Sequence, residues 1–182
     1  MTVFVENLNK NPAIDIGGFV HLGDDSFCLC GDKKVTVKTV DDESWFIELD
    51  QFIIGDEYAL TSNLSNMQII ISPSLPYIML PDDLYNNFLT KYKIRNVNKI
   101  HFSTVYRLPT LKFFIGGQVF RVPALNYANS EPNKNLFLIR SNRNTEFESD
   151  NIIYLGRAFL YGACLHVNNI DGTVALSKPI KN

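Results

Sequence analysis

The chain has 182 residues, of which 46% are hydrophobic, 12% aromatic and 20% charged, and its formal net charge is -2. These values are typical of a soluble globular domain. The basic residues are scattered rather than gathered in a stripe, so nothing in the charge pattern indicates nucleic-acid binding. A chain of this length can bury roughly 70% of the surface that it exposes when unfolded. We therefore expect a single domain over residues 1–182.

The apolar segments of the chain are too short for a membrane span, which needs roughly 18 consecutive apolar residues. Residues 1–6 also lack the basic start and long apolar core of a signal peptide. We expect a protein with no membrane association and an intracellular, cytoplasmic location.

Short β-branched or aromatic runs dominate the first part of the chain, and some of them alternate with polar residues. Residues 3–5, 35–37 and 46–49 are the clearest examples, and polar or glycine-rich turns separate such runs. One of these turns contains the acidic residues Asp41, Asp42 and Glu43, which we interpret as solvated. The pattern predicts an all-β, mainly antiparallel fold with one or two short helices.

The clearest helix signal begins at Pro81. Proline suits the first turn of a helix, and Asp82 and Asp83 complement the positive helix amino terminus. We interpret the two carboxylates as structural rather than as an acid/base pair. Three apolar residues would form the buried side of this helix: Leu84, Phe88 and Leu89.

Residues 128–151 are polar and rich in asparagine, apart from a predicted strand at 136–139. The flanking segments 129–134 and 141–150 are predicted to be mobile surface loops, with partner contacts as the alternative.

The chain contains three cysteines: Cys28, Cys30 and Cys164. Cys28 and Cys30 alternate along one run, so their side chains are expected on one face of a strand. We expect all three to be buried free thiols. The alternative is a metal site that uses His21, Cys28 and Cys30, but this set lacks the paired ligand spacing of structural zinc sites. No metal or other cofactor is expected.

Six segments become informative through their order along the chain. They are GGFVHLG at 17–23, SWFIELDQFIIG at 44–55, RLPTLKFFIGG at 107–117, PALNY at 123–127, YLGRAFL at 154–160 and NIDGTVAL at 169–176. In this order they resemble the carboxyl-terminal lobe of the pepsin-like aspartic peptidase family. The resemblance implies one lobe of that fold, without the amino-terminal lobe that the family normally has.

In this family two aspartates, one from each lobe, share a proton and activate the attacking water. The resemblance places Ser72 at the aspartate of the Asp-Thr-Gly motif, Pro73 at the threonine and Ser74 at the glycine. A neutral serine cannot replace a carboxylate as general base, and Pro73 has no backbone N–H to support one. A homodimer would still lack both aspartates. We therefore expect no catalytic residues and no peptidase activity.

Two further residue patterns bear on this site. Arg157 occupies the position of the aspartate in the family's Leu-Gly-Asp segment, which puts the polar contacts there in doubt. Ser72 as a nucleophile with His101 or His166 is an alternative that the sequence does not favour, because no Gly-x-Ser-x-Gly elbow surrounds it. Both histidines are expected to be strand residues with local hydrogen bonds.

An isolated lobe of this fold is expected to expose strand edges and apolar surface that a second lobe would cover, and exposed edges favour pairing. Our leading hypothesis is an inactive lobe, a pseudoprotease, that binds a protein partner or itself through that surface. The alternative is one half of a split aspartic peptidase that pairs with a separate amino-terminal lobe, or that regulates it by unproductive pairing.

Overall fold

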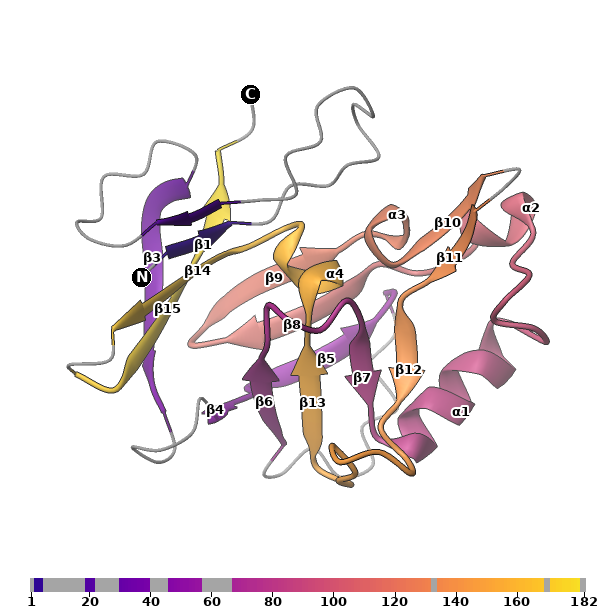
Figure 1. Ribbon diagram of the computed structural model, residues 1–182, viewed down its shortest axis with the longest axis horizontal. Helices are drawn as coiled ribbons and strands as arrows, with labels where there is room; N and C mark the ends of the chain where they lie inside the picture. The colour runs from indigo at the N-terminus through magenta and orange to yellow at the C-terminus, as the bar shows by residue number, and fades with distance from the viewer. Residues whose placement is uncertain are drawn as a thin grey trace.

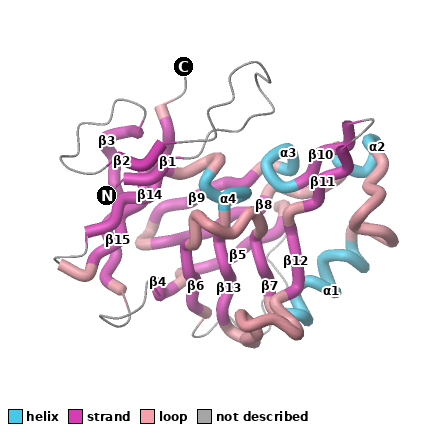
Figure 2. Tube along the Cα trace, viewed as in Figure 1, coloured by secondary structure: helices cyan, strands magenta, loops and turns pink. Residues whose placement is uncertain are grey.

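The computed structural model describes residues 2–4, 19–21, 30–39, 46–56, 67–131, 134–168 and 171–180. The sequence predictions for Asp41, Asp42, Glu43 and Cys28, and for the glycines at 17, 18 and 23, lie outside these ranges. β-strand is the commonest regular structure in the described chain, with a few short helices (Figure 2). The predicted all-β, mainly antiparallel fold is confirmed.

The first sheet contains strands from both ends of the chain. Its order is β2-β1-β14-β15-β3, and every pairing in it is antiparallel. The strands are β1 (Thr2–Phe4), β2 (Phe19–His21), β3 (Cys30–Lys38), β14 (Cys164–Asn168) and β15 (Thr173–Pro179). We call it the terminal sheet; it lies on the left of the molecule in Figure 1.

The second sheet is mixed, and its order is β12-β7-β13-β6-β4. Its strands are β4 (Phe46–Glu48), β6 (Gln68–Ile71), β7 (Ile78–Leu80), β12 (Ile139–Ser141) and β13 (Ile152–Leu155). Strand β13 is parallel to β6 on one side and antiparallel to β7 on the other. Because β13 lies between two strands that follow each other in the chain, the segment joining β6 to β7 must cross over its end (Figure 1).

A three-stranded sheet, β5-β8-β9, completes the body of the fold. It consists of β5 (Gln51–Ile54), β8 (Leu111–Ile115) and β9 (Gln118–Val122). Gly116 and Gly117 form the turn between β8 and β9, with φ angles of 55° and 76° that favour glycine. A Cβ on Gly116 would overlap with Val35 of β3, so this glycine also lets the hairpin pack closely against the terminal sheet.

The core forms where these sheets face one another, and aromatic side chains fill much of it. Phe52 and Phe113 stack with ring centroids 4.7 Å apart, and Phe113 meets Phe159 edge to face at 5.6 Å. All three side chains are almost completely buried. Such rings supply a large share of the apolar burial that stabilises a domain of this size.

Four short helices lie around the sheets: α1 (Asp82–Lys91), α2 (Phe102–Val105), α3 (Ala124–Tyr127) and α4 (Arg157–Leu160). Helix α1 starts immediately after Pro81, as the sequence predicts. Phe88 is fully buried, while Leu84 and Leu89 are partly buried against the core. Among the described helices, none has the length and apolar character that crossing a membrane requires.

The prediction of free thiols was wrong for two of the three cysteines. Cys30 and Cys164 form a disulfide, with Cα atoms 6.1 Å apart and a sequence separation of 134. The two residues meet because β3 and β14 both pair with β15 in the terminal sheet. The alternative metal site is excluded by the same bond, since a disulfide sulfur does not serve as a thiolate ligand.

The two segments predicted to be mobile loops differ in the structure. In the first, strand β10 (Ala128–Glu131) pairs antiparallel with β11 (Lys134–Phe137), so its described residues are not a loop. The turn at 141–150 is built around Asn142, which is 1% exposed and donates from Nδ2 to the Ser149 carbonyl at 2.6 Å. The Thr145 hydroxyl in turn donates to the Asn142 carbonyl. This segment is thus a surface loop, as its polar composition indicates, and its polar groups bond to one another.

Candidate functional site

Residues 72–77 form the crossover segment that joins β6 to β7 past the end of β13. The Ser72 N–H donates to the Leu155 carbonyl at 3.0 Å, which continues the β6–β13 ladder by one residue. The Leu75 N–H then donates to the Ser72 carbonyl at 3.1 Å and closes a tight turn. The segment is therefore held at a fixed position where two parallel strands end.

Gly156 allows the crossover segment to lie directly against the end of β13. Its N–H donates to the Tyr77 carbonyl at 3.0 Å, and the N–H of Arg157 donates to the Leu75 carbonyl at 2.7 Å. A Cβ on Gly156 would clash with both of these carbonyl oxygens. This close approach explains why the YLGRAFL segment has a glycine at position 156. The next residue, Arg157, is basic and supplies no carboxylate.

The polar side chains that the crossover segment presents are hydroxyls. The Oγ atoms of Ser72 and Ser74 lie 2.9 Å apart and share a hydrogen bond, and Ser74 is exposed. Pro73 between them contributes no N–H. Residues 72–77 include no aspartate or glutamate.

The charged residues beside the crossover segment are basic. The Arg140 guanidinium lies over the Tyr77 ring, 5.0 Å from its centroid, which is within cation–π range. Arg157 is exposed at the first position of α4. Burial is the main cause that raises the pKa of Tyr85, and the nearby Arg140 opposes that shift.

The two histidines considered as bases for Ser72 have other roles. His101 was predicted to be a strand residue, and this prediction was wrong: it is the N-cap of α2. Its Nδ1 accepts a hydrogen bond from the Ser103 N–H and lies 2.9 Å from the Ser103 hydroxyl. His166 does lie in a strand, β14, where its Nε2 is 3.0 Å from the Oγ of Ser177. Ser177 is completely buried, so this pair is closed to a substrate.

Asp82 is the first residue of α1, at the helix start where the sequence places it. Its carboxylate makes contacts that the sequence does not reveal. It accepts from the hydroxyl of Ser141 at 2.7 Å and from Nη1 of Arg143 at 3.1 Å. The Ser141 hydrogen bond is the largest cause that lowers the pKa of Asp82. Asp82 thereby fastens the start of α1 to the 141–150 turn.

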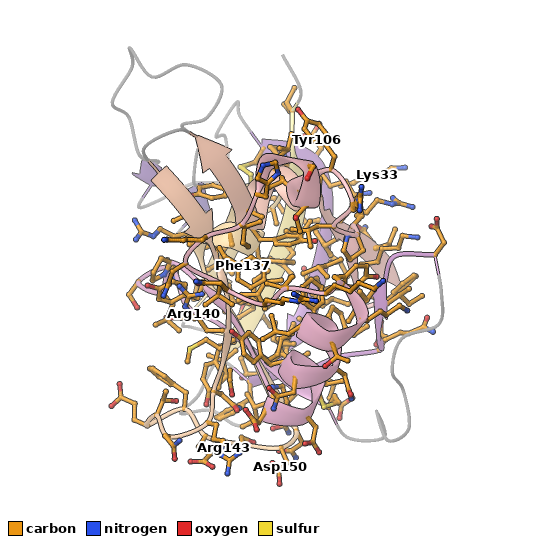
Figure 3. The ribbon with its side chains drawn as sticks, turned by 90° about the vertical axis from the view of Figure 1, so that its right-hand side faces the viewer. Lys33, Tyr106, Phe137, Arg140, Arg143 and Asp150 are labelled. Atoms are coloured by element: carbon orange, nitrogen blue, oxygen red, sulfur yellow. A yellow bond between two sulfur atoms is a disulfide. The ribbon has the colours of Figure 1, made fainter. Side chains whose placement is uncertain are left out.

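Around this contact lies an open pocket of about 250 Å³. Its lining residues are Asp82, Asp83, Asn142, Arg143, Glu148 and Asp150. Arg143 and Asp150 lie together at one end of the molecule, whereas Lys33 and Tyr106 lie at the other (Figure 3). Within the described ranges no three acidic, histidine or cysteine side chains form a metal-binding group, and Glu148 is already engaged by the N–H of Asn144.

Comparisons with known proteins support the fold alone. No protein-family model matches the sequence, and no curated protein sequence matches it. Among solved structures, the chain is similar to an aspartic proteinase from Irpex lacteus, with a TM-score of 0.73 and 12% sequence identity. The match covers 98% of this chain and 56% of that one. The chain therefore has the fold of one lobe of a pepsin-like aspartic proteinase and spans little more than half the length of the protein it matches.

Proposed function

We propose that this chain is a catalytically inactive aspartic-proteinase-like lobe, a pseudoprotease, that acts as a protein-binding or assembly module. The observation that carries the proposal is the crossover segment at 72–77, which presents the hydroxyls of Ser72 and Ser74 and contains no carboxylate. The match to a lobe of a proteinase gives the fold, and activity does not follow from fold.

The chemistry of aspartic proteolysis requires a carboxylate at this position. One carboxylate must be ionised to take a proton from water while its partner donates a proton to the substrate carbonyl. A serine hydroxyl stays un-ionised at the pH at which such a reaction runs, and the 2.9 Å bond to Ser74 engages it locally. Arg140 and Arg157 beside the segment supply no base, because guanidinium groups remain protonated.

A binding role is supported by the terminal sheet. In the described part of the chain this sheet ends at β2 on one side and at β3 on the other, and an edge strand offers backbone N–H and C=O groups for pairing. Ile180, directly after β15, is 50% exposed. We propose this sheet as the surface that meets a partner, either a second lobe of the same fold in another chain or a second copy of this chain.

The alternative function is that of one half of a split aspartic peptidase. A separate amino-terminal lobe would then supply one aspartate, and the other half of the dyad would still be a serine. The lack of a carboxylate in residues 72–77 makes regulation by unproductive pairing the stronger form of this alternative.

The test is an acid-peptidase assay of the chain alone and together with whatever protein copurifies with it in a fixed ratio. The proposal predicts no cleavage of an unfolded protein substrate in either sample, and an active pepsin sample controls for the assay. Cleavage that an aspartic-peptidase inhibitor abolishes, and that disappears in a Ser72→Ala variant, would overturn it. A protein that copurifies in a fixed ratio, without cleavage, supports the binding role. If no protein copurifies, the binding half of the proposal is wrong.

A further inference from the structure

The bond between Cys30 and Cys164 reaches across the terminal sheet, from its edge strand β3 to the interior strand β14. We propose that this disulfide is a permanent covalent part of the protein, that the protein acquires it in an oxidising compartment, and that it holds β3 in the sheet. The inference concerns the covalent state of the chain and does not depend on the proposed binding role.

The disulfide is attached to β3 at the end where its backbone pairing with β15 is irregular. Cys30 is the first residue of β3 and lies opposite Pro179, which has no N–H to donate to the ladder. The register between β15 and β3 also shifts between Ser177 and Pro179. The backbone pairing is therefore weakened at the end of β3 where the disulfide is attached.

The other cysteine lies on a strand that is paired on both sides. Cys164 is opposite Ser177 of β15, and its neighbours Ala163 and Leu165 are completely buried. The bond consequently ties a weakly paired edge to a part of the sheet that is well anchored. In the described ranges β3 has β15 as its one sheet neighbour, and the disulfide adds a covalent attachment to that backbone pairing.

Burial makes the bond persistent once it has formed. Cys164 is 0% exposed and Cys30 is 7% exposed, so a thiol reductant cannot reach either sulfur without opening the sheet. Labile, regulatory disulfides are characteristically strained or exposed. This one is placed as a structural bond.

Formation of the bond has a defined redox balance. The two thiols of Cys30 and Cys164 lose two protons and two electrons, and the S–S bond forms between them. The electrons pass by thiol–disulfide exchange to a disulfide-bearing oxidant, such as an oxidised dithiol protein, whose own disulfide becomes two thiols. Glutathione and thioredoxin keep most cytosolic thiols reduced, so we infer an oxidising compartment in place of the cytoplasmic location expected from the sequence.

The first test is peptide mapping of the protein from its native cells, lysed in an alkylating agent and digested without reductant. We expect the Cys164 peptide to be linked to the peptide that contains Cys28 and Cys30. Variants made in the same cells show whether Cys28 or Cys30 is the partner of Cys164. Cys28→Ser should keep the link, and Cys30→Ser should lose it. Alkylated Cys164 in most molecules, or a link that survives Cys30→Ser, would overturn the inference.

The second test addresses the clamp on β3. Amide hydrogen exchange is compared between Cys28→Ser and the double variant Cys28→Ser with Cys164→Ala. We expect exchange in residues 30–38 to be about tenfold faster or more without the disulfide, while residues 111–122 of β8 and β9 change little. Equal exchange of β3 in the two proteins would show that the disulfide does not hold this strand.

Discussion

The N–H of Gly156 donates a 3.0 Å hydrogen bond to the carbonyl oxygen of Tyr77, at the end of β13 where the crossover segment passes. No side chain fits there, since a Cβ would meet the carbonyl oxygens of Leu75 and Tyr77. Gly156 thus allows the crossover segment at 72–77 to lie directly against the end of β13.

Gly156→Ala should destabilise the protein by about 1–3 kcal/mol or more, because backbone atoms on both sides must move to admit the methyl group. Chemical denaturation measured by tryptophan or tyrosine fluorescence gives the free energy of unfolding. Gly117→Asn is the matched control: a Cβ there meets nothing within 4 Å, and asparagine tolerates the φ of 76°. Equal losses in the two variants would contradict this role for Gly156.

Asp82→Asn should weaken the attachment of α1 to the 141–150 turn. The folded protein holds the pKa of Asp82 below its ordinary value of 3.8, chiefly through the Ser141 hydroxyl. A lowered pKa means that the ionised form stabilises the fold above pH 3.8 and that this contribution is lost as the pH falls through the folded pKa. Unfolding measured between neutral and acid pH should therefore show a smaller acid loss in Asp82→Asn than in the original chain. An equal acid loss in the two proteins would contradict this role for Asp82.

Tyr127→Phe should cost about 1–3 kcal/mol, because the buried Tyr127 hydroxyl donates to the Pro109 carbonyl and its removal leaves that acceptor unpaired. Denaturation in urea provides the measurement. Tyr106→Phe is the control, since Tyr106 is 70% exposed and its hydroxyl loss should change stability by less than about 0.5 kcal/mol. Similar effects of both variants would contradict the expectation.

Alkaline pH provides a separate test of the same tyrosine. Burial, with a smaller effect of Tyr92, raises the pKa of Tyr127 above its ordinary value of 10.0. A raised pKa means that stability is complete below pH 10.0 and falls as the pH rises from there towards the folded pKa. Absorbance of ionised tyrosine should show one slow component that appears only with unfolding and is missing in Tyr127→Phe. Immediate ionisation of every tyrosine in the folded protein would be the contrary result.

Loss of the disulfide should lower the free energy of unfolding by at most about 5 kcal/mol, the loop-closure value for a sequence separation of 134. The comparison is between Cys28→Ser and Cys28→Ser with Cys164→Ala, which differ only in whether the bond can form. Thermal unfolding without reductant measures the difference. Equal melting temperatures would show that the bond adds nothing to the folded state.

The sequence predicted those parts of the fold that depend on local pattern or on residues with a special backbone role. Gly116 and Gly117, Gly156 and the Pro81 helix start are all where the sequence indicates, because glycine and proline constrain the backbone wherever they occur. The overall lobe followed from their order along the chain.

The failures of prediction involve contacts between distant segments. Cys30 and Cys164 are separated by 134 residues, and strand alternation assigns a face to a cysteine but no partner. The Asp82–Arg143 ion pair also joins distant segments, with a sequence separation of 61. One further failure is local: the pairing of β10 with β11 was missed because asparagine, serine and glutamate favour strands weakly, and here cross-strand pairing overrides that preference.

The most direct test of the central claim combines native mass spectrometry with lysine cross-linking on the tagged protein, purified from its native cells without reductant. The account predicts a complex of fixed stoichiometry, with a second protein or a second copy, and cross-links from Lys33, Lys34 and Lys38 of β3 to the partner. Lysines far from the terminal sheet, such as Lys93 after α1, should link far less. A monomer that binds nothing, or a complex joined only through other faces, would contradict it.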